Sequence, residues 1–176
     1  VPVLERADPR DVLIDRWGLP LRELPPGARI GTSSPRREAQ LRSLRPDLHL
    51  LPIRGNVETR VAKALGRDYD GVVVAAAGLS RLGLLKEGVA EFLPPQVCTP
   101  APGQGALAAE LRSDDAQLLE MVKALQHRET AAAVEAERWV LRAAGSGCQV
   151  PIGALAVVHG ASLRLSAACS SGDGSI

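Results

Sequence analysis

The stretch Arg29-Ile30-Gly31-Thr32-Ser33-Ser34-Pro35-Arg36-Arg37 decides the fold, because a short apolar strand passes here through a small polar turn into a helix. Ser34 is suited to cap that helix, and Pro35 is suited to be its first residue. The helix is predicted to run to about Leu44 and to end before Pro46. The pattern therefore predicts a strand–turn–helix unit.

Arg36 and Arg37 are unusual residues for the first turn of a helix, because the helix dipole already places partial positive charge there. Free backbone N–H groups, hydroxyls and two guanidinium groups converge at this point, and together they suit a carboxylate or a phosphate. The alternative is that both arginines are solvated on a surface helix. The stretch alone leaves both interpretations open.

Three short apolar strands, at about 29–31, 48–53 and 72–75, alternate with predicted helices. Such alternation predicts βαβ crossovers and a mainly parallel sheet, whose functional edge lies at the carboxyl ends of its strands. Arg54 and Arg60 follow the second strand. The four arginines are thus predicted to share one rim and to bind a ligand with several negative charges.

Ahead of these strands, Asp8-Pro9-Arg10 has the pattern of a helix start, with Asp8 as the cap and Pro9 as the first helical residue. The helix is predicted to run to Trp17 and to stop at Gly18.

The second half of the chain opens on a Pro/Gly-rich crossing at 99–106, typical of a hinge or an inter-domain link. A strand is predicted at 107–111, followed by a helix from 115 to about 125 that Asp114 caps. Helical spacing of apolar residues predicts the longest helix at 130–144. Two antiparallel strands are then predicted at 154–158 and 162–168.

Composition excludes several classes of function. The 176 residues carry a net charge of +1, so no strong field favours nucleic acid or an anionic membrane. Only two Trp, one Tyr and one Phe are present, too few for a base-stacking platform. Three cysteines without C-x-x-C spacing argue against a disulfide framework and a zinc site. No apolar run is long enough to span a bilayer.

Cys148 follows Gly145-Ser146-Gly147, so small residues leave space around its sulfur. A thiolate in such a loop could act as a nucleophile or an attachment point. The alternative is a small buried apolar side chain, the common state of a free cysteine. We expect Cys98 and Cys169, in or beside apolar segments, to be of that buried kind.

A series of motifs stands in one order along the chain: Gly31-Thr32-Ser33-Ser34 with Arg36-Arg37, Leu44-Arg45-Pro46-Asp47-Leu48, Arg54-Gly55-Asn56-Val57 with Thr59-Arg60, Ala75-Ala76-Ala77-Gly78-Leu79 with Arg81-Leu82-Gly83-Leu84, Gly103-Gln104-Gly105-Ala106, and Gly147-Cys148-Gln149-Val150-Pro151-Ile152-Gly153-Ala154. In these motifs the chain resembles the porphobilinogen deaminase (hydroxymethylbilane synthase) family.

The resemblance implies a transferase of tetrapyrrole (haem) biosynthesis. It condenses four porphobilinogen molecules into hydroxymethylbilane, with loss of ammonia, on a dipyrromethane primer. Cys148 is implied to hold that cofactor by a thioether, because a thiolate captures deaminated porphobilinogen. The residues implied to bind cofactor and substrate carboxylates or to add hydrogen bonds are Thr32, Ser33, Ser34, Arg36, Arg37, Arg54, Arg60 and Gln104.

The same resemblance implies an α/β fold: a periplasmic-binding-protein-like parallel-sheet domain, part of a first domain, and a truncated α+β third domain. The corresponding divisions are 1–98, 99–126 for the hinge with the return strand and helix of the first domain, and 127–176 for the cofactor-carrying domain. No residue matches the family's general-acid aspartate, so that role is unassigned. Pro35 replaces a usual apolar residue and suits the first position of a helix.

The abrupt ends of the chain suggest a fragment that is inactive by itself, exposes apolar surface around 107–111 and self-associates. The intact enzyme is expected to be a cytoplasmic monomer. A competing hypothesis is a non-catalytic module that binds a dicarboxylate or another anion on its arginine rim. A pyrrole adduct on Cys148 would distinguish the enzyme from that module.

Overall fold

A mixed sheet organises the first part of the chain in the computed structural model, which describes residues 2–64, 66–85, 90–145 and 151–171. Its five strands lie in the order β3-β2-β4-β1-β5. They span Asp11–Asp15 (β1), Arg29–Gly31 (β2), His49–Leu51 (β3), Gly71–Ala75 (β4) and Ala90–Leu93 (β5). Strands β2, β3 and β4 are parallel, and β1 is antiparallel to both β4 and β5.

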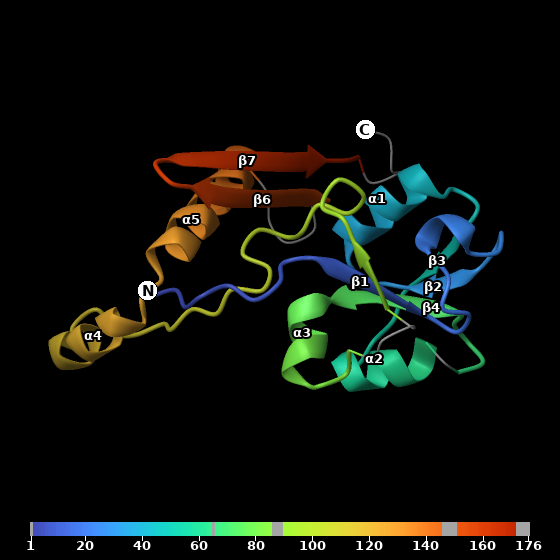
Figure 1. Cartoon of the computed structure of the whole chain (residues 1–176), viewed down its shortest axis with the longest axis horizontal. Helices are drawn as coiled ribbons and strands as arrows, with labels where there is room; N and C mark the ends of the chain where they lie inside the picture. Colours follow the sequence, from blue (N-terminus) through green and yellow to red (C-terminus); the bar gives the residue numbers. More distant parts are fainter. Residues whose placement is uncertain (1, 65, 86–89, 146–150, 172–176) are drawn as a thin grey trace.

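Helices cover both faces of this sheet. Helix α1 (Pro35–Leu44) lies on one face, and α2 (Val57–Ala64) and α3 (Ala76–Arg81) lie on the other (Figure 1). A short 3-10 helix, Leu21–Glu23, follows β1.

Strand alternation separates the two cores. Leu13 of β1 and Val73 of β4 face α1 and pack with Leu41, whereas their neighbours on the same strands face the opposite way and pack with Leu79 of α3. A strand buried on both faces needs a continuous apolar run, and Val12-Leu13-Ile14 supplies one.

The strand–turn–helix prediction is confirmed. Ser34 caps α1 through a hydrogen bond that its side chain accepts from the Arg37 N–H, and Pro35 is the first helical residue. The strands predicted at 48–53 and 72–75 are also present, parallel to β2 through the order β3-β2-β4.

The helix predicted from Asp8 to Trp17 is wrong, because this segment contains β1, which lies inside the sheet between β4 and β5. The Asp8 carboxylate does accept a hydrogen bond from the Arg10 N–H, at 2.9 Å, but it forms only a local turn. The apolar residues that follow are buried between β4 and β5, so pairing with distant strands overrides the local signal.

The second part of the chain leaves the sheet in an extended segment that runs beside the N-terminal residues. Backbone hydrogen bonds join Leu4 to Leu107 and Ala7 to Gly105. The strand predicted at 107–111 is wrong, because only one isolated bridge, Val3 with Ala108, forms there. Gly105 is required at this approach: its φ is +85° and a Cβ would lie 2.6 Å from the Ala7 carbonyl oxygen.

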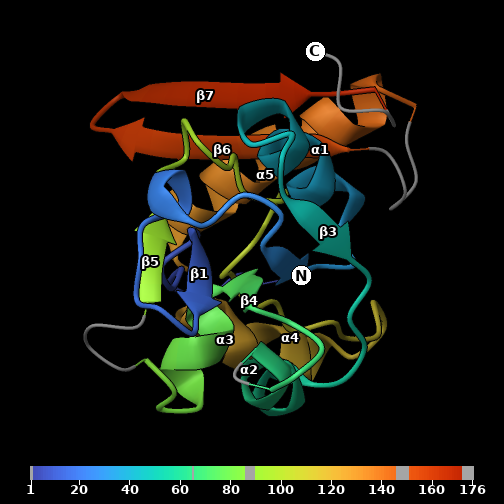
Figure 2. The same cartoon turned by 90° about the vertical axis from the view of Figure 1, so that its right-hand side faces the viewer.

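Two helices and a hairpin complete the described chain (Figure 2). They are α4 (Ala116–Val122) with a 3-10 turn at Lys123–Leu125, α5 (Arg128–Ala143), β6 (Ile152–His159) and β7 (Ser162–Cys169). The predicted antiparallel pair is confirmed.

One predicted cap and one predicted helix start are wrong by a short distance. Asp115, and not Asp114, accepts the capping hydrogen bond of α4, and α5 begins at Arg128 with His127 as its cap. In both cases the residue whose side chain reaches the free N–H two or three positions on decides the start of the helix.

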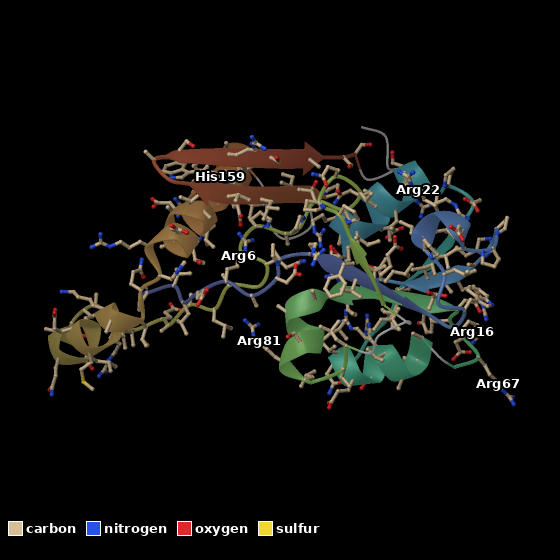
Figure 3. The ribbon with its side chains drawn as sticks, in the orientation of Figure 1. Arg6, Arg16, Arg22, Arg67, Arg81 and His159 are labelled. Carbon is tan, nitrogen blue, oxygen red and sulfur yellow. The ribbon has the colours of Figure 1, made fainter. Side chains whose placement is uncertain are left out.

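A buried carboxylate on α5 joins the two parts of the molecule. Glu137 is fully buried and forms an ion pair with Arg6, at 2.6 Å. It also accepts hydrogen bonds from the backbone N–H groups of Gly103 and Ala156, each at 2.7 Å. Arg6 projects from the N-terminal segment into the space between α5 and the sheet (Figure 3). Because four chain segments meet at one carboxylate, α5 and the hairpin are tied to both extended segments.

The fold is therefore a mixed α/β arrangement with a parallel portion. Within the described residues, no helix combines the length and the apolar character needed to cross a bilayer.

Candidate functional site

A cavity of about 650 Å³ opens where β2 and β3 end. It contains four of the predicted binding residues: Thr32 and Ser33 after β2, and Arg54 and Arg60 after β3. The complete lining is Thr32, Ser33, Pro35, Glu38, Leu50, Pro52, Ile53, Arg54, Gly55 and Arg60. The carboxyl ends of parallel strands thus meet at a hollow, as in other open α/β sheets.

Backbone hydrogen bonds fix the floor of this cavity. The Ser33 hydroxyl donates to the Ile53 carbonyl oxygen, at 2.7 Å, and accepts from the Ile53 N–H, at 2.9 Å. The Thr32 N–H donates to the Leu51 carbonyl oxygen, at 2.9 Å. The turn after β2 is therefore held against the segment after β3, and Ser33 has a structural task in addition to its predicted one.

The two arginines of the cavity retain free donors. Arg60 donates a hydrogen bond from its Nε–H to the Gly55 carbonyl oxygen, at 2.8 Å. Arg54 is exposed, and its guanidinium group has no hydrogen bond or ion pair to any residue that the structure describes. Asn56 caps α2 by accepting from the Thr59 N–H, at 2.8 Å, which sets the helix that carries Arg60. Both guanidinium groups are available to an anion.

Arg36 and Arg37 lie elsewhere, in the interior beside Asp11 of β1. Arg36 Nη2 is 2.8 Å from Asp11 Oδ2, and Arg37 Nη2 is 2.7 Å from Asp11 Oδ1. Relative exposure is 0% for Asp11, 4% for Arg36 and 9% for Arg37. Neither arginine is solvated, and neither lines the cavity.

Further partners complete this buried arrangement, which we call the Asp11 cluster (Asp11, Arg36, Arg37, Cys98 and Gln104). Gln104 Nε2 donates to Asp11 Oδ1, at 2.8 Å, and the Cys98 thiol lies 3.3 Å from Asp11 Oδ2. Arg36 Nη1 donates to the Thr99 carbonyl oxygen, at 2.6 Å, whereas Arg36 Nε is buried without a partner in the described chain. The cluster thus joins β1, α1 and the crossing after β5.

Electrostatics follow from these contacts. Burial raises the pKa of Asp11, but Arg37 and Arg36 outweigh it, so the pKa of this carboxyl lies below its ordinary value. Burial, reinforced by the Asp11 charge, raises the pKa of the Cys98 thiol to about 12. Asp11 is therefore ionised and Cys98 is a neutral donor at neutral pH.

The eight predicted binding residues therefore fall into three places. Thr32, Ser33, Arg54 and Arg60 line the cavity; Arg36, Arg37 and Gln104 belong to the Asp11 cluster; Ser34 caps α1. The prediction that the four arginines share one rim is therefore wrong.

Cys148, the predicted attachment residue, lies outside the described residues. Cys98 is buried as expected, whereas Cys169 is exposed, which contradicts the expectation of a buried side chain. It ends the outer strand β7, most of whose residues are exposed.

Sequence reasoning missed Asp11 and Glu137. Glu137 was detectable, because an acidic residue within the apolar stripe of a helix needs a buried cationic partner. Asp11 gave no comparable signal, since a helix was expected around it.

The comparisons with known proteins agree with one another. A family profile described as "Porphobilinogen deaminase, dipyromethane cofactor binding domain" matches residues 1–120, and one described as "Porphobilinogen deaminase, C-terminal domain" matches residues 131–176.

Curated relatives carry the same name. The chain is 49% identical to the porphobilinogen deaminase of Desulforamulus reducens, over 98% of this chain and 55% of the relative. It is 51% identical to that of Roseiflexus castenholzii, over 91% of this chain and 52% of the relative. The chain spans about half the length of the curated relatives that it matches. It belongs to the porphobilinogen deaminase family.

Proposed function

We propose that a full-length protein carrying this sequence is a porphobilinogen deaminase, a transferase of tetrapyrrole biosynthesis. It condenses four porphobilinogen molecules into hydroxymethylbilane and loses one ammonia at each condensation. The observation that carries the proposal is the cavity, where two guanidinium groups with free donors lie beside hydroxyls at the ends of parallel strands.

The chemistry of the substrate suits this cavity. Porphobilinogen carries an acetate and a propionate, so each added unit brings two carboxylates. Arg54 and Arg60 offer planar donor pairs that match carboxylates. The Thr32 hydroxyl, which accepts from the Ser34 N–H at 3.3 Å, retains its own proton for a ligand oxygen.

The donor set also fits dipyrromethane, whose pyrrole rings carry the same acid side chains. When bound, this cofactor supplies the terminal pyrrole carbon to which the first substrate unit is joined. We propose Cys148 as its thioether attachment residue, and Arg54 and Arg60 as holders of cofactor and substrate carboxylates.

Arg36, Arg37 and Gln104 are proposed to bind ligand carboxylates from the inner side. The cluster carries two guanidinium charges against one carboxylate, so it retains a net positive charge. Arg36 Nε is its buried donor without a partner in the described chain. Ser34 is proposed to act through the orientation of α1. We assign no general acid.

The finer architecture is also part of the proposal. Residues 1–98 would form a periplasmic-binding-protein-like domain, 99–126 the hinge with the return strand and helix of another domain, and 127–176 part of the cofactor-carrying domain. We propose a monomeric cytoplasmic enzyme. The 176-residue chain by itself is expected to release no product, because it lacks a match to the general acid.

Intact mass spectrometry of the full-length protein tests the proposal. We expect the Cys148 peptide to carry the added mass of dipyrromethane and the purified protein to form hydroxymethylbilane from porphobilinogen. C148S should abolish the added mass. A protein that binds porphobilinogen but carries no adduct and forms no product would instead be a non-catalytic anion-binding module.

A further inference from the structure

We propose that Glu38 makes the cavity selective for a pyrrole that carries an ammonium group as well as carboxylates. The inference rests on the proposed function, because it concerns how the same cavity distinguishes porphobilinogen from other pyrrole dicarboxylates.

The cavity contains groups of both charges. Glu38 lines it together with Arg54 and Arg60. Glu38 belongs to the first turn of α1, whereas Arg54 and Arg60 come from the segment after β3 and from α2. An acidic residue is unexpected in a hollow that binds only anions, because it repels each carboxylate that enters.

The local role of Glu38 does not explain this placement. Its Oε1 accepts a hydrogen bond from Arg42 Nη2, at 2.8 Å, as an i,i+4 pair on the helix surface. The two side chains are 45% and 44% exposed, so solvent screens the pair and it adds little to stability. Glu38 Oε2 has no hydrogen-bond partner among the described residues. One carboxylate oxygen therefore remains for a ligand.

Porphobilinogen has the complementary arrangement of charges. Its ring carries the acetate and the propionate on two neighbouring carbons and an aminomethyl group, an ammonium at neutral pH, on the carbon next to the acetate. With the carboxylates on Arg54 and Arg60, the ammonium can lie near Glu38, on the part of the lining that α1 supplies. A pyrrole with the same two acids but no amine gains the arginine contacts and meets only repulsion from Glu38.

Calorimetric titration of the 176-residue chain with two pyrroles tests the inference. One ligand is porphobilinogen, and the other is the same pyrrole dicarboxylate without the aminomethyl group. We expect E38Q to weaken porphobilinogen binding about fivefold and to strengthen binding of the amine-free pyrrole by about the same factor, the size expected for one charge pair near 4 Å in a solvated site.

The matched control is E58Q, which removes an acidic residue from the first turn of α2 outside the cavity lining. It should leave both affinities within about twofold of those of the wild-type chain. R42Q removes the helix partner of Glu38 and should keep the preference for the amine, because the carboxylate remains in the cavity.

The outcomes separate the inference from the proposed function. If the wild-type chain binds both pyrroles and E38Q changes both affinities in the same direction or neither of them, the selectivity role is wrong while the cavity remains a pyrrole site. If the wild-type chain binds neither pyrrole, both the inference and the cavity's role in the proposed function are overturned.

Discussion

Two pairs of arginines follow neighbouring parallel strands, β2 and β3, and lie in opposite environments. Arg36 and Arg37 begin the helix after β2, and Arg54 and Arg60 flank the start of the helix after β3. The first pair is buried against Asp11, whereas the second lines an open cavity. A carboxylate from a distant strand, and not the helix start itself, separates a buried ion cluster from an open cavity whose arginines keep free donors.

The topology explains where that carboxylate comes from. Strand β1 is antiparallel to β4, so its first residue, Asp11, lies opposite Ala75, the last residue of β4. This register brings an acidic side chain to the edge where the parallel strands end. Strand β3 lies at the edge of the sheet and has β2 as its one neighbour, so the sheet places no acidic residue beside Arg54.

The largest expected effect comes from removing the Asp11 charge. D11N leaves two buried guanidinium groups without a counter-ion, and we expect it to lower the free energy of unfolding by about 3–5 kcal/mol. Denaturant titration of the 176-residue chain measures this. The control is D8N. Asp8 pairs with Arg10 at a partly exposed site, so D8N should lower the free energy of unfolding by under about 1 kcal/mol.

Equal effects of D11N and D8N would contradict the distinction between a buried cluster and surface pairs. A second readout is the thiol of Cys98. In the wild-type chain it should resist alkylation at pH 8, because it is buried and its pKa is raised to about 12, while exposed Cys169 should react. D11N should open the cluster and speed the reaction of Cys98.

Local patterns were sufficient for much of the fold. Ser34-Pro35 specifies the start of α1, and the apolar run at 72–75 specifies β4, because caps and apolar runs act over a few residues. The prediction failed at β1, where Asp8-Pro9 imitates a helix start. A strand that lies between two partners far away in the sequence is specified by its pairing with them, and a short stretch of sequence does not include those partners.

The candidate site divides in the same way. Arg54 and Arg60 could be placed at the functional edge, since position after a parallel strand is a topological property. The burial of Arg36 and Arg37 could not be inferred, because it depends on the register of Asp11 against Ala75.

An intermediate case sharpens the comparison. Asp70 accepts from Arg29 Nε and Nη2, each at 2.9 Å, and its side chain is only 13% exposed while that of Arg29 is 37% exposed. The hydrogen bonds from Arg29 lower the pKa of Asp70 to about 2 from its ordinary value of 3.8. The folded state therefore favours the ionised form, and this stabilisation is present above pH 3.8.

We expect the Asp70 contribution to be lost as the pH falls from about 4 to about 2. Because solvent screens the charge of Arg29, D70N should lower the free energy of unfolding by only on the order of 1 kcal/mol at pH 7. Near pH 2 it should change this free energy hardly at all. The unfolding free energies of wild type and D70N, compared across this range, measure it. D68N, which removes an exposed carboxylate two residues away, should show no such convergence.

The smallest effect on stability is expected where the effect on binding is largest. R54Q removes an exposed guanidinium with no partner in the described chain, so the free energy of unfolding should change by less than about 0.5 kcal/mol. R37Q, which leaves Asp11 with one cation fewer inside the protein, should cost about 3 kcal/mol. R54Q should nevertheless weaken the binding of porphobilinogen to the chain about tenfold, since a charge-assisted pair of hydrogen bonds to a carboxylate is lost. The weakening should shrink as salt is raised, because exposed charges are screened. If R54Q instead unfolded the chain and left binding intact, the cavity arginine would be structural, and the two pairs of arginines would not differ in kind.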